Sequence, residues 1–144
     1  MRIGRTFSFE AAHRLEFHDG RCRRLHGHSY RLELVFGGSL RSPDAGDPQS
    51  GFVVDFGVLD RLVRRELIDP FLDHRDLNES IPELPYTSAE YLAAWIVGWC
   101  ARFLQGRPEL GRAQILEARL WETERSWAVA DREDARQLGF LPPA

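Results

Sequence analysis

Lysine is absent from this chain of 144 residues, and cysteine is scarce. All 19 basic side chains are arginines, which excludes any mechanism that needs a lysine Schiff base or a lysine general base. Any anion site would have to be formed by arginine side chains, whose planar guanidinium donors suit phosphate. A compositional bias of the source genome is the simpler explanation for the missing lysines. The two cysteines, Cys22 and Cys100, lie in unlike contexts and indicate a reducing compartment rather than a disulfide framework.

Long hydrophobic runs and a strong excess of charge are missing as well. The sequence has no apolar stretch of transmembrane length and no charged-then-apolar leader, so we expect no membrane span, no export and a cytoplasmic location. Its net charge of −3 argues against a nucleic-acid partner, since domains that bind nucleic acid usually carry a basic excess. A small-molecule partner fits better. The length suits a single domain over residues 1–144.

Three of the five histidines fall where strands are predicted. His26 and His28 precede an alternating run from Tyr30 to Phe36, so their imidazoles point to the same face of one strand. His13 closes a second alternating run. If the two runs pair, three imidazoles converge and leave a fourth position open, which is the arrangement of a catalytic zinc. The pattern therefore predicts a Zn²⁺ site on these histidines; the alternative is three ordinary surface or core histidines.

Cys22 lies close before His26, and the residues around it leave several roles open. It could be a fourth zinc ligand, a small apolar filler, a nucleophile or a base. The flanking Arg21, Arg23 and Arg24 would favour its thiolate by charge attraction. The arginines therefore favour a chemical role for Cys22 over a packing role.

Helical periodicity marks two segments. The first covers residues 57–69 and is expected to end at Pro70. The second has a capping box from Thr87 to Glu90 at its start and Gly106 at its end. Its apolar stripe contains Leu92, Trp95, Ile96, Trp99, Cys100 and Phe103. Because Cys100 belongs to this stripe, we interpret it as packing rather than a reactive thiol.

Two further strands, residues 113–123 and 125–131, close the pattern, and residues 131–144 are expected to form a peripheral tail. The order of two strands, two helices and two strands (ββααββ) predicts an α+β fold, in which an antiparallel four-stranded sheet carries two helices on one face. The uncovered face and the sheet edges need a partner, which indicates a homo-oligomer.

In addition to the three histidines, two acidic residues are candidate site residues. Glu122 extends an apolar row of the strand at residues 113–123, where a carboxylate is costly unless it is paired, so a donor on a ligand is a candidate partner. Asp73 and His74 lie together in the long connector between the helices. Long connectors in small domains are often functional, but a solvated turn is an equally good interpretation.

Five segments together resemble the 6-pyruvoyl-tetrahydropterin synthase and 6-carboxy-tetrahydropterin synthase superfamily. They appear in family order and span nearly the whole chain: residues 9–15 (FEAAHRL), 22–28 (CRRLHGH), 52–56 (FVVDF), 72–74 (LDH) and 121–123 (WET). The resemblance implies the tunnelling fold, in which subunits join their sheets into a barrel. It also implies a homo-oligomer, with a hexamer suspected, whose active sites lie at subunit interfaces.

Residue roles also follow from this resemblance. It implies zinc on the three histidines named above, in agreement with their spacing. Cys22 would be the proton-abstracting base, and Asp73 and His74 its relay and acid partners. Glu122 would anchor the guanidine-like edge of the pterin. The implied substrate is 7,8-dihydroneopterin triphosphate, whose phosphates would suit nearby arginines.

The spacing between Cys22 and His26 distinguishes two branches. Only Arg23, Arg24 and Leu25 separate them, which resembles the 6-carboxy branch of queuosine biosynthesis. The implied products are 6-carboxy-5,6,7,8-tetrahydropterin, acetaldehyde and triphosphate. A 6-pyruvoyl product is one alternative, and a non-catalytic zinc- or pterin-binding protein is another.

Overall fold

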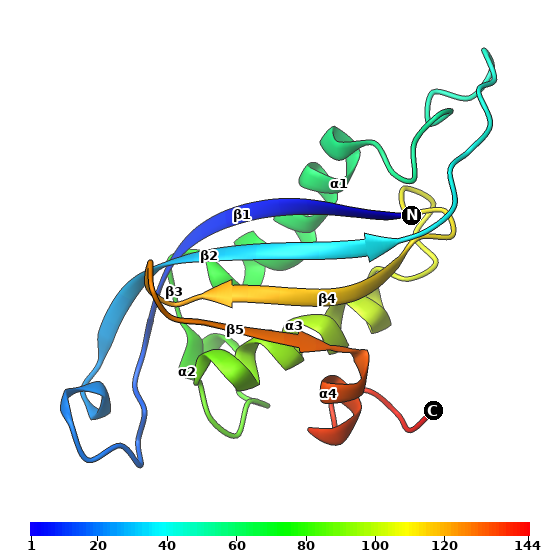
Figure 1. Cartoon of the computed structure of the whole chain (residues 1–144). Helices are drawn as coiled ribbons and strands as arrows, with labels where there is room; N and C mark the ends of the chain where they lie inside the picture. The colour runs from blue at the N-terminus through cyan, green and yellow to red at the C-terminus, as the bar shows by residue number, and fades with distance from the viewer.

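Two long strands, β1 (Arg2–His13) and β2 (His26–Gly37), form an antiparallel hairpin at the centre of the sheet (Figure 1). They belong to a computed structural model that describes every residue from Met1 to Ala144. Buried residues alternate with exposed ones along both strands, and Phe9 stacks on Tyr30 across the pair at a ring-centroid distance of 4.9 Å. A slip of one residue would turn this buried row to solvent, so the core fixes the register.

The sheet has five strands in the order β3-β1-β2-β4-β5. β4 (Gln114–Trp121) and β5 (Trp127–Asp131) continue it antiparallel beside β2, whereas β3 (Arg75–Asp76) pairs with β1 in parallel. The prediction of four antiparallel strands is therefore wrong in number and in kind. A two-residue strand is too short to leave an alternating pattern in the sequence.

Helices cover one face of this mixed sheet, and the core lies between the two layers (Figure 1). The prediction of two helices is also wrong, because the structure has four α-helices. They are α1 (Phe56–Val63), α2 (Leu77–Ser80), α3 (Ala89–Phe103) and α4 (Arg132–Gln137). Each of the two extra helices is a short segment, below the length at which periodicity identifies a helix.

Pro70 does not end the first helical segment. Past α1 the chain continues as a π-helix, η2 (Arg64–Leu72), with Pro70 inside it. The wider π turn uses hydrogen bonds to the fifth preceding residue, and the amide of Asp73 donates such a bond to Ile68 at 2.8 Å. This turn brings Asp73 and His74 to the edge of β1.

The long helix α3 is buried along most of its length, as its stripe predicts, and burial raises the pKa of the Cys100 thiol. Its cap differs from the prediction. Ser88, not Thr87, is the N-cap, and its hydroxyl accepts from the amide of Tyr91. Thr87 is instead buried beside His13, and Glu90 is exposed with no role in the cap.

The C-terminal segment, expected to be a peripheral tail, is only partly peripheral. Helix α4 begins at a capping box between Asp131 and Asp134 and packs against α3. Ala135, Phe140 and Leu141 are buried in the common core. Their contribution to the core could not be recognised in a short, mostly polar stretch.

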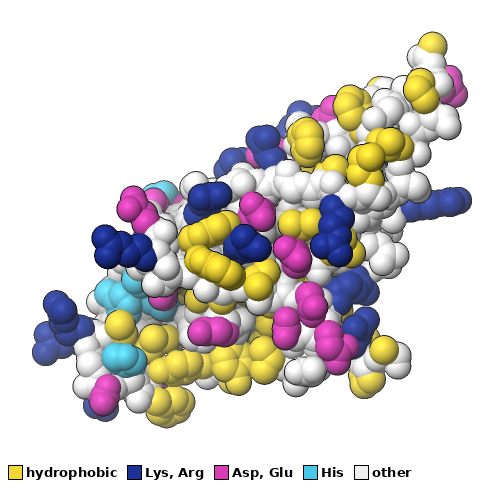
Figure 2. Space-filling model, viewed as in Figure 1, with side chains coloured by type: hydrophobic (Ala, Val, Ile, Leu, Met, Phe, Trp, Pro, Cys, Tyr) yellow, Lys and Arg dark blue, Asp and Glu magenta, His cyan; other side chains and the backbone are white.

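The face of the sheet opposite the helices is left open to solvent. Figure 2 shows hydrophobic side chains among charged ones across it. Trp127 and Val129 of the edge strand β5 are 53% and 44% exposed, and Arg119 lies over the Trp127 ring at 4.9 Å. None of the helices has the length and apolar character needed to cross a membrane.

Candidate metal centre and active site

The structure brings His13, His26 and His28 together at one end of the central hairpin. His13 pairs with His26 across the strands, and His28 follows two residues later on the same face. The ligand atoms of the three imidazoles all lie within 4.8 Å of one another. The i, i+2 spacing and the antiparallel register are sufficient to produce this cluster.

Hydrogen bonds orient two of these rings. Nδ1 of His13 lies 2.8 Å from the carbonyl oxygen of Thr87, and Nδ1 of His26 lies 2.7 Å from that of Arg24. A carbonyl only accepts, so Nδ1 carries the proton in each ring and Nε2 presents a lone pair in the neutral form. The Nε2 atoms of all three rings are buried and have no hydrogen-bond partner.

This arrangement fits a metal ion. Burial lowers the pKa of His13, and the neighbouring His26 and His28 lower it further, against the opposing effects of the Thr87 carbonyl and the Glu122 carboxylate. Burial also lowers the pKa of His28. The three neutral imidazoles have convergent lone pairs, and each ring is held by its other nitrogen or by packing. Such a set of nitrogen ligands suits zinc.

A polar network behind His13 was not predicted from the sequence. Thr87 and His13 are the only buried polar residues, at 2% and 0% exposure, and they are hydrogen-bonded to each other. The Thr87 hydroxyl donates to the carbonyl of Arg14 at 3.1 Å. The Asn78 side chain accepts from the amide of Arg14 at 2.9 Å and donates to its carbonyl at 3.1 Å. Nothing in the local sequence around Asn78 or Thr87 indicates these long-range contacts.

Glu122 lies directly against the histidines. Its Oε1 atom is 3.3 Å from Nε2 of His13 and 3.6 Å from Nε2 of His28. The carboxylate thus faces imidazole nitrogens that carry lone pairs in the neutral rings, and the expected donor on a ligand stays a prediction. The pairing of β2 with β4 shifts register between Val35 and Phe36, and Ile115 is buried in the core. The buried row that leads to Glu122 therefore contains Ala118 and Leu120 but not Leu116.

A small cavity of about 170 Å³ adjoins Glu122. Its other polar lining residues include Glu90 and Ser88 at the start of α3 and Ser126 in the turn after β4, and Trp127 forms part of its wall. Two carboxylates therefore line one cavity beside the candidate metal centre. The capping-box interpretation obscured Glu90 as a candidate binding residue.

Asp73 and His74 form a second polar group on the other side of the hairpin. Asp73 Oδ2 contacts His74 Nδ1 at 2.9 Å, and its Oδ1 accepts from the amide of Glu10 at 2.9 Å. Burial alone would raise the pKa of Asp73, but these hydrogen bonds hold it below its usual value. His74 has a left-handed backbone with φ of 56°, fixed by a bond from its amide to the Glu10 carbonyl at 2.6 Å.

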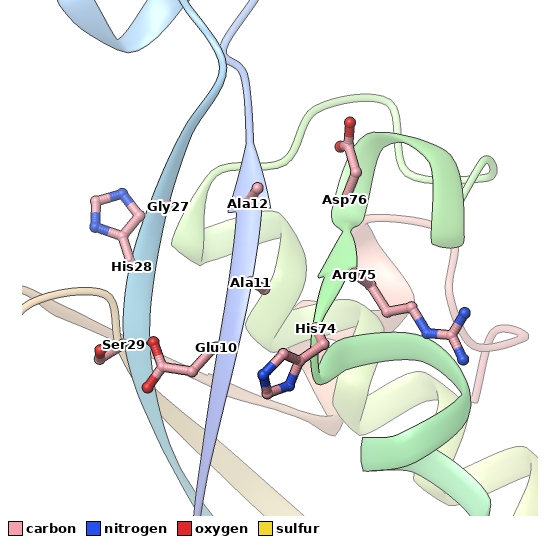
Figure 3. Close-up of a pocket in the computed structure, with 9 residues that line it drawn as sticks. All are labelled: Glu10, Ala11, Ala12, Gly27, His28, Ser29, His74, Arg75 and Asp76. Carbon is pink, nitrogen blue, oxygen red and sulfur yellow. Dashed lines mark hydrogen bonds between the residues drawn. The ribbon is translucent and has the colours of Figure 1, made fainter.

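His74 is 79% exposed on its side chain and faces an open cavity of about 500 Å³ (Figure 3). Glu10 and Ser29, from β1 and β2, line the same cavity and are joined by a hydrogen bond from the Ser29 hydroxyl to the Glu10 carboxylate at 2.7 Å. An oriented but exposed imidazole beside an open cavity can exchange protons with a molecule bound there.

Cys22 belongs to neither group. It lies in a short 3₁₀ helix, η1 (Arg21–Arg23), in the loop between β1 and β2, and it is partly exposed. Its sulfur is not among the atoms that converge on the candidate metal position, so the four-ligand site with a cysteine finds no support in this geometry. It also does not line the cavity beside His74. The structure thus does not bring Cys22 together with Asp73 and His74 within one chain.

Comparison with known proteins adds independent information. Residues 2–133 match the family model described as 6-pyruvoyl tetrahydropterin synthase. A curated protein of Synechocystis sp., named 6-carboxy-5,6,7,8-tetrahydropterin synthase, is 42% identical over 115 residues, which are 80% of this chain and 84% of that protein. One of Haemophilus influenzae with the same name is 32% identical over 145 residues and covers 88% of this chain and 95% of that protein.

Two further matches bear on activity and on fold. A protein of Pyrococcus furiosus named dihydroneopterin monophosphate aldolase is 32% identical over 126 residues, or 88% of this chain and 97% of that protein. The solved structure of Caenorhabditis elegans 6-pyruvoyl tetrahydropterin synthase superposes with a TM-score of 0.71 at 23% identity, covering 91% of this chain and 94% of that one. At this identity the likeness establishes a shared fold.

Proposed function

The chain belongs to the 6-pyruvoyl tetrahydropterin synthase family, and we propose that it converts 7,8-dihydroneopterin triphosphate to 6-carboxy-5,6,7,8-tetrahydropterin, acetaldehyde and triphosphate. The names of its relatives are those of enzymes, and the chain is an enzyme of this class. Within the family, the three-residue gap between Cys22 and His26 supports the 6-carboxy branch, which serves queuosine biosynthesis.

The observation that carries the proposal is the cluster of three buried, unpartnered Nε2 atoms on His13, His26 and His28, with a carboxylate beside it. This donor set suits Zn²⁺ as the cofactor. Zinc bound there would act as a Lewis acid toward the side-chain oxygens of the substrate.

The carboxylates of Glu122 and Glu90 would bind the pterin. Both face the cavity next to the histidines, and carboxylates accept paired hydrogen bonds from a guanidine-like edge. Trp127 offers an aromatic wall for the ring. This placement would set the pterin's side chain toward the metal centre.

Proton transfer falls to Cys22 and His74. Cys22, as a thiolate, would take a proton from the substrate side chain at Sγ. Asp73 engages Nδ1 of His74, which leaves Nε2 as the nitrogen that gives and receives protons. Because Cys22 and His74 lie apart in one chain, we propose that each active site combines them from different subunits of a homo-oligomer, with a hexamer as the expected assembly.

Product analysis tests the function. Zinc-loaded protein is incubated with 7,8-dihydroneopterin triphosphate and the products are identified by mass, beside a Cys22→Ala variant. We expect 6-carboxy-tetrahydropterin and acetaldehyde from the wild type, and a loss of turnover of about 10²- to 10⁴-fold in the variant with zinc content unchanged. Normal turnover by Cys22→Ala would exclude Cys22 as the base.

Other outcomes identify the alternatives. A 6-pyruvoyl product would move the enzyme to the sister branch. Consumption of the monophosphate in preference to the triphosphate would indicate the aldolase activity named for the Pyrococcus furiosus relative. No consumption of any of these substrates would favour a non-catalytic zinc- or pterin-binding protein.

A further inference from the structure

A second cavity, of about 390 Å³, lies at the end of the sheet opposite the histidines. Its walls come from the loop that leaves β2 and from the turn that precedes β4, both of which lie near the N-terminus in Figure 1. The 12 residues of β2, at about 3.3 Å each, place this cavity roughly 35 Å or more from the candidate metal centre. No small molecule can contact both within one chain.

The charged residues that line this cavity are two arginines, Arg41 and Arg112. Arg41 has one acidic neighbour, Asp47, and Arg112 has none. The Nη1 atom of Arg41 lies 3.5 Å from Oδ2 of Asp47, which is longer than a charge-assisted hydrogen bond of about 2.7–2.9 Å. Two guanidinium groups with unused donors therefore line a cavity that contains no carboxylate.

The backbone holds Arg41 in position. Its amide donates to the Phe52 carbonyl at 3.0 Å, and its carbonyl accepts from the Gly51 amide at 2.9 Å, which closes the base of the loop. Its guanidinium group lies against Gly111, which has a left-handed backbone with φ of 57°. A Cβ atom on Gly111 would lie only 2.5 Å from Nη2 of Arg41, so glycine permits the close approach of the arginine to the turn before β4.

Further donors and an apolar wall complete the cavity. The backbone amides of Ser39, Leu40 and Arg112 form no hydrogen bond within the chain and can donate to a ligand. The apolar lining consists of Leu40, Val53 and Ala113, all aliphatic. The volume falls within the range of about 300–1,000 Å³ that is usual for small-molecule sites, and it exceeds what a phosphate ion alone would fill.

We propose that this cavity binds the phosphate group of a small organic molecule at a site separate from the metal centre. Arg41 and Arg112 would hold the phosphate oxygens through paired N–H groups, and the aliphatic wall would pack against the organic part. Asp47 competes with the phosphate for Arg41. The site goes beyond the proposed function, and its test does not depend on the reaction that the enzyme catalyses.

Isothermal titration calorimetry of the zinc-loaded protein tests the site with adenosine monophosphate, inorganic phosphate and inorganic triphosphate. Arg61→Gln is the matched control, because Arg61 is exposed on α1 and lies outside the cavity. Wild type and Arg61→Gln should bind at least one of these probes equally, and Arg112→Gln should bind it about tenfold or more weakly. No binding of any probe, or equal binding by Arg112→Gln, would overturn the proposal.

The three probes also identify the source of the phosphate group. Tighter binding of adenosine monophosphate than of inorganic phosphate would support an organic phosphate, and preference for the inorganic ions would overturn the organic part of the proposal. Asp47→Asn should tighten binding, because it removes the competing charge and keeps an acceptor for the Gln49 amide. Weaker binding by Asp47→Asn would contradict the role assigned to Arg41.

Hydrogen-deuterium exchange locates the bound probe. Exchange should slow in residues 39–41 and 111–113, whose unpaired amides lie at the cavity, in the wild type and in Arg61→Gln. Slowing confined to the histidine end of the hairpin would overturn the separate site. A raised KM for 7,8-dihydroneopterin triphosphate in Arg112→Gln would also overturn it, because the cavity would then belong to the active site of a neighbouring subunit.

Discussion

At the scale of single residues, the direction of each imidazole nitrogen decides what the histidine cluster can do. His26 is fixed by the Arg24 carbonyl, and its Nε2 is buried without a partner. We expect His26→Ala to lose both metal and activity while the fold remains, because the substitution removes one of the three convergent imidazoles and two imidazoles alone hold zinc far less tightly than three. Metal content by mass spectrometry and far-UV circular dichroism check this.

His18 offers the matched control for that substitution. It is exposed, and its Nδ1 accepts a bond from the nearby Gly20 amide, outside the cluster. His18→Ala should keep full metal content. Full zinc occupancy in His26→Ala would remove His26 from the ligand set.

The histidine cluster could be predicted from the sequence, whereas the residues that hydrogen-bond around it could not. The spacing of His26 and His28 and the strand pattern around His13 are local, so their convergence follows from the pairing of two strands. Thr87 and Asn78 reach the same site from segments more than sixty residues away along the chain. Such contacts depend on how helices pack on the sheet, which no local pattern of residues specifies.

At the scale of elements, the four-residue helix α2 acts as a clamp on the end of β1. Its Asn78 bonds both the amide and the carbonyl of Arg14, the residue after His13. We expect Asn78→Ala to weaken metal binding about 10- to 100-fold, as loss of supporting contacts does in other metal sites. Competition with a chromophoric chelator measures this affinity.

Two variants of α2 separate positioning from general stability. Asn78→Asp keeps an acceptor for the Arg14 amide but no donor for its carbonyl, and should give an intermediate affinity. Glu79→Gln changes an exposed neighbour and should have no effect. A lower melting temperature with unchanged metal affinity in Asn78→Ala would show that Asn78 only stabilises the fold.

An ion pair joins helix α1 to strand β1. Asp60 accepts hydrogen bonds from Arg5 at 2.8 Å and from Arg64 at 3.0 Å. Burial alone would raise the pKa of Asp60, but the two arginines outweigh it and lower the pKa. Because the folded pKa is depressed, this contribution to stability is present above the unfolded value of about 3.9 and is lost as the pH falls through the folded pKa.

Asp60→Asn should therefore lower the free energy of unfolding by roughly 0.5–1 kcal/mol at neutral pH, the size expected for a partly exposed pair. The difference from wild type should shrink near the unfolded pKa, at about pH 4, because the carboxylate of the unfolded chain is then partly protonated while the folded one is still ionised. Urea unfolding at both pH values measures it. The exposed Asp69→Asn is the control, and an equal difference at both pH values would contradict the assigned role of the charge.

The elements themselves were predictable to the extent that their periodicity extends over enough residues. The hairpin strands and α3 are long and regular, and the sequence places them correctly. The π-helix η2 and the two-residue β3 carry no such pattern, although together they position Asp73 and His74. The missed elements are thus the ones that bring these two candidate catalytic residues to the sheet.

At the scale of the whole molecule, the two proton-transfer candidates lie in separate places. Cys22 is in the β1–β2 loop, and His74 faces an open cavity that Cys22 does not line. The sheet face opposite the helices and the edge strand β5 also expose Trp127 and Val129. An assembly that covers this surface could place the cavity of one chain against the loop of another.

Complementation between inactive variants tests this arrangement. Cys22→Ala and His74→Ala should each be inactive alone. Co-expressed in equal amounts, they should regain about a quarter of wild-type turnover per site, because random assembly gives that share of sites an intact cysteine from one subunit and an intact His74 from its neighbour. Mass photometry checks that both chains enter the same oligomer. Mixed oligomers without activity would place both residues in a site formed by a single chain, and the exposed His74 would then have to move toward Cys22 when substrate binds.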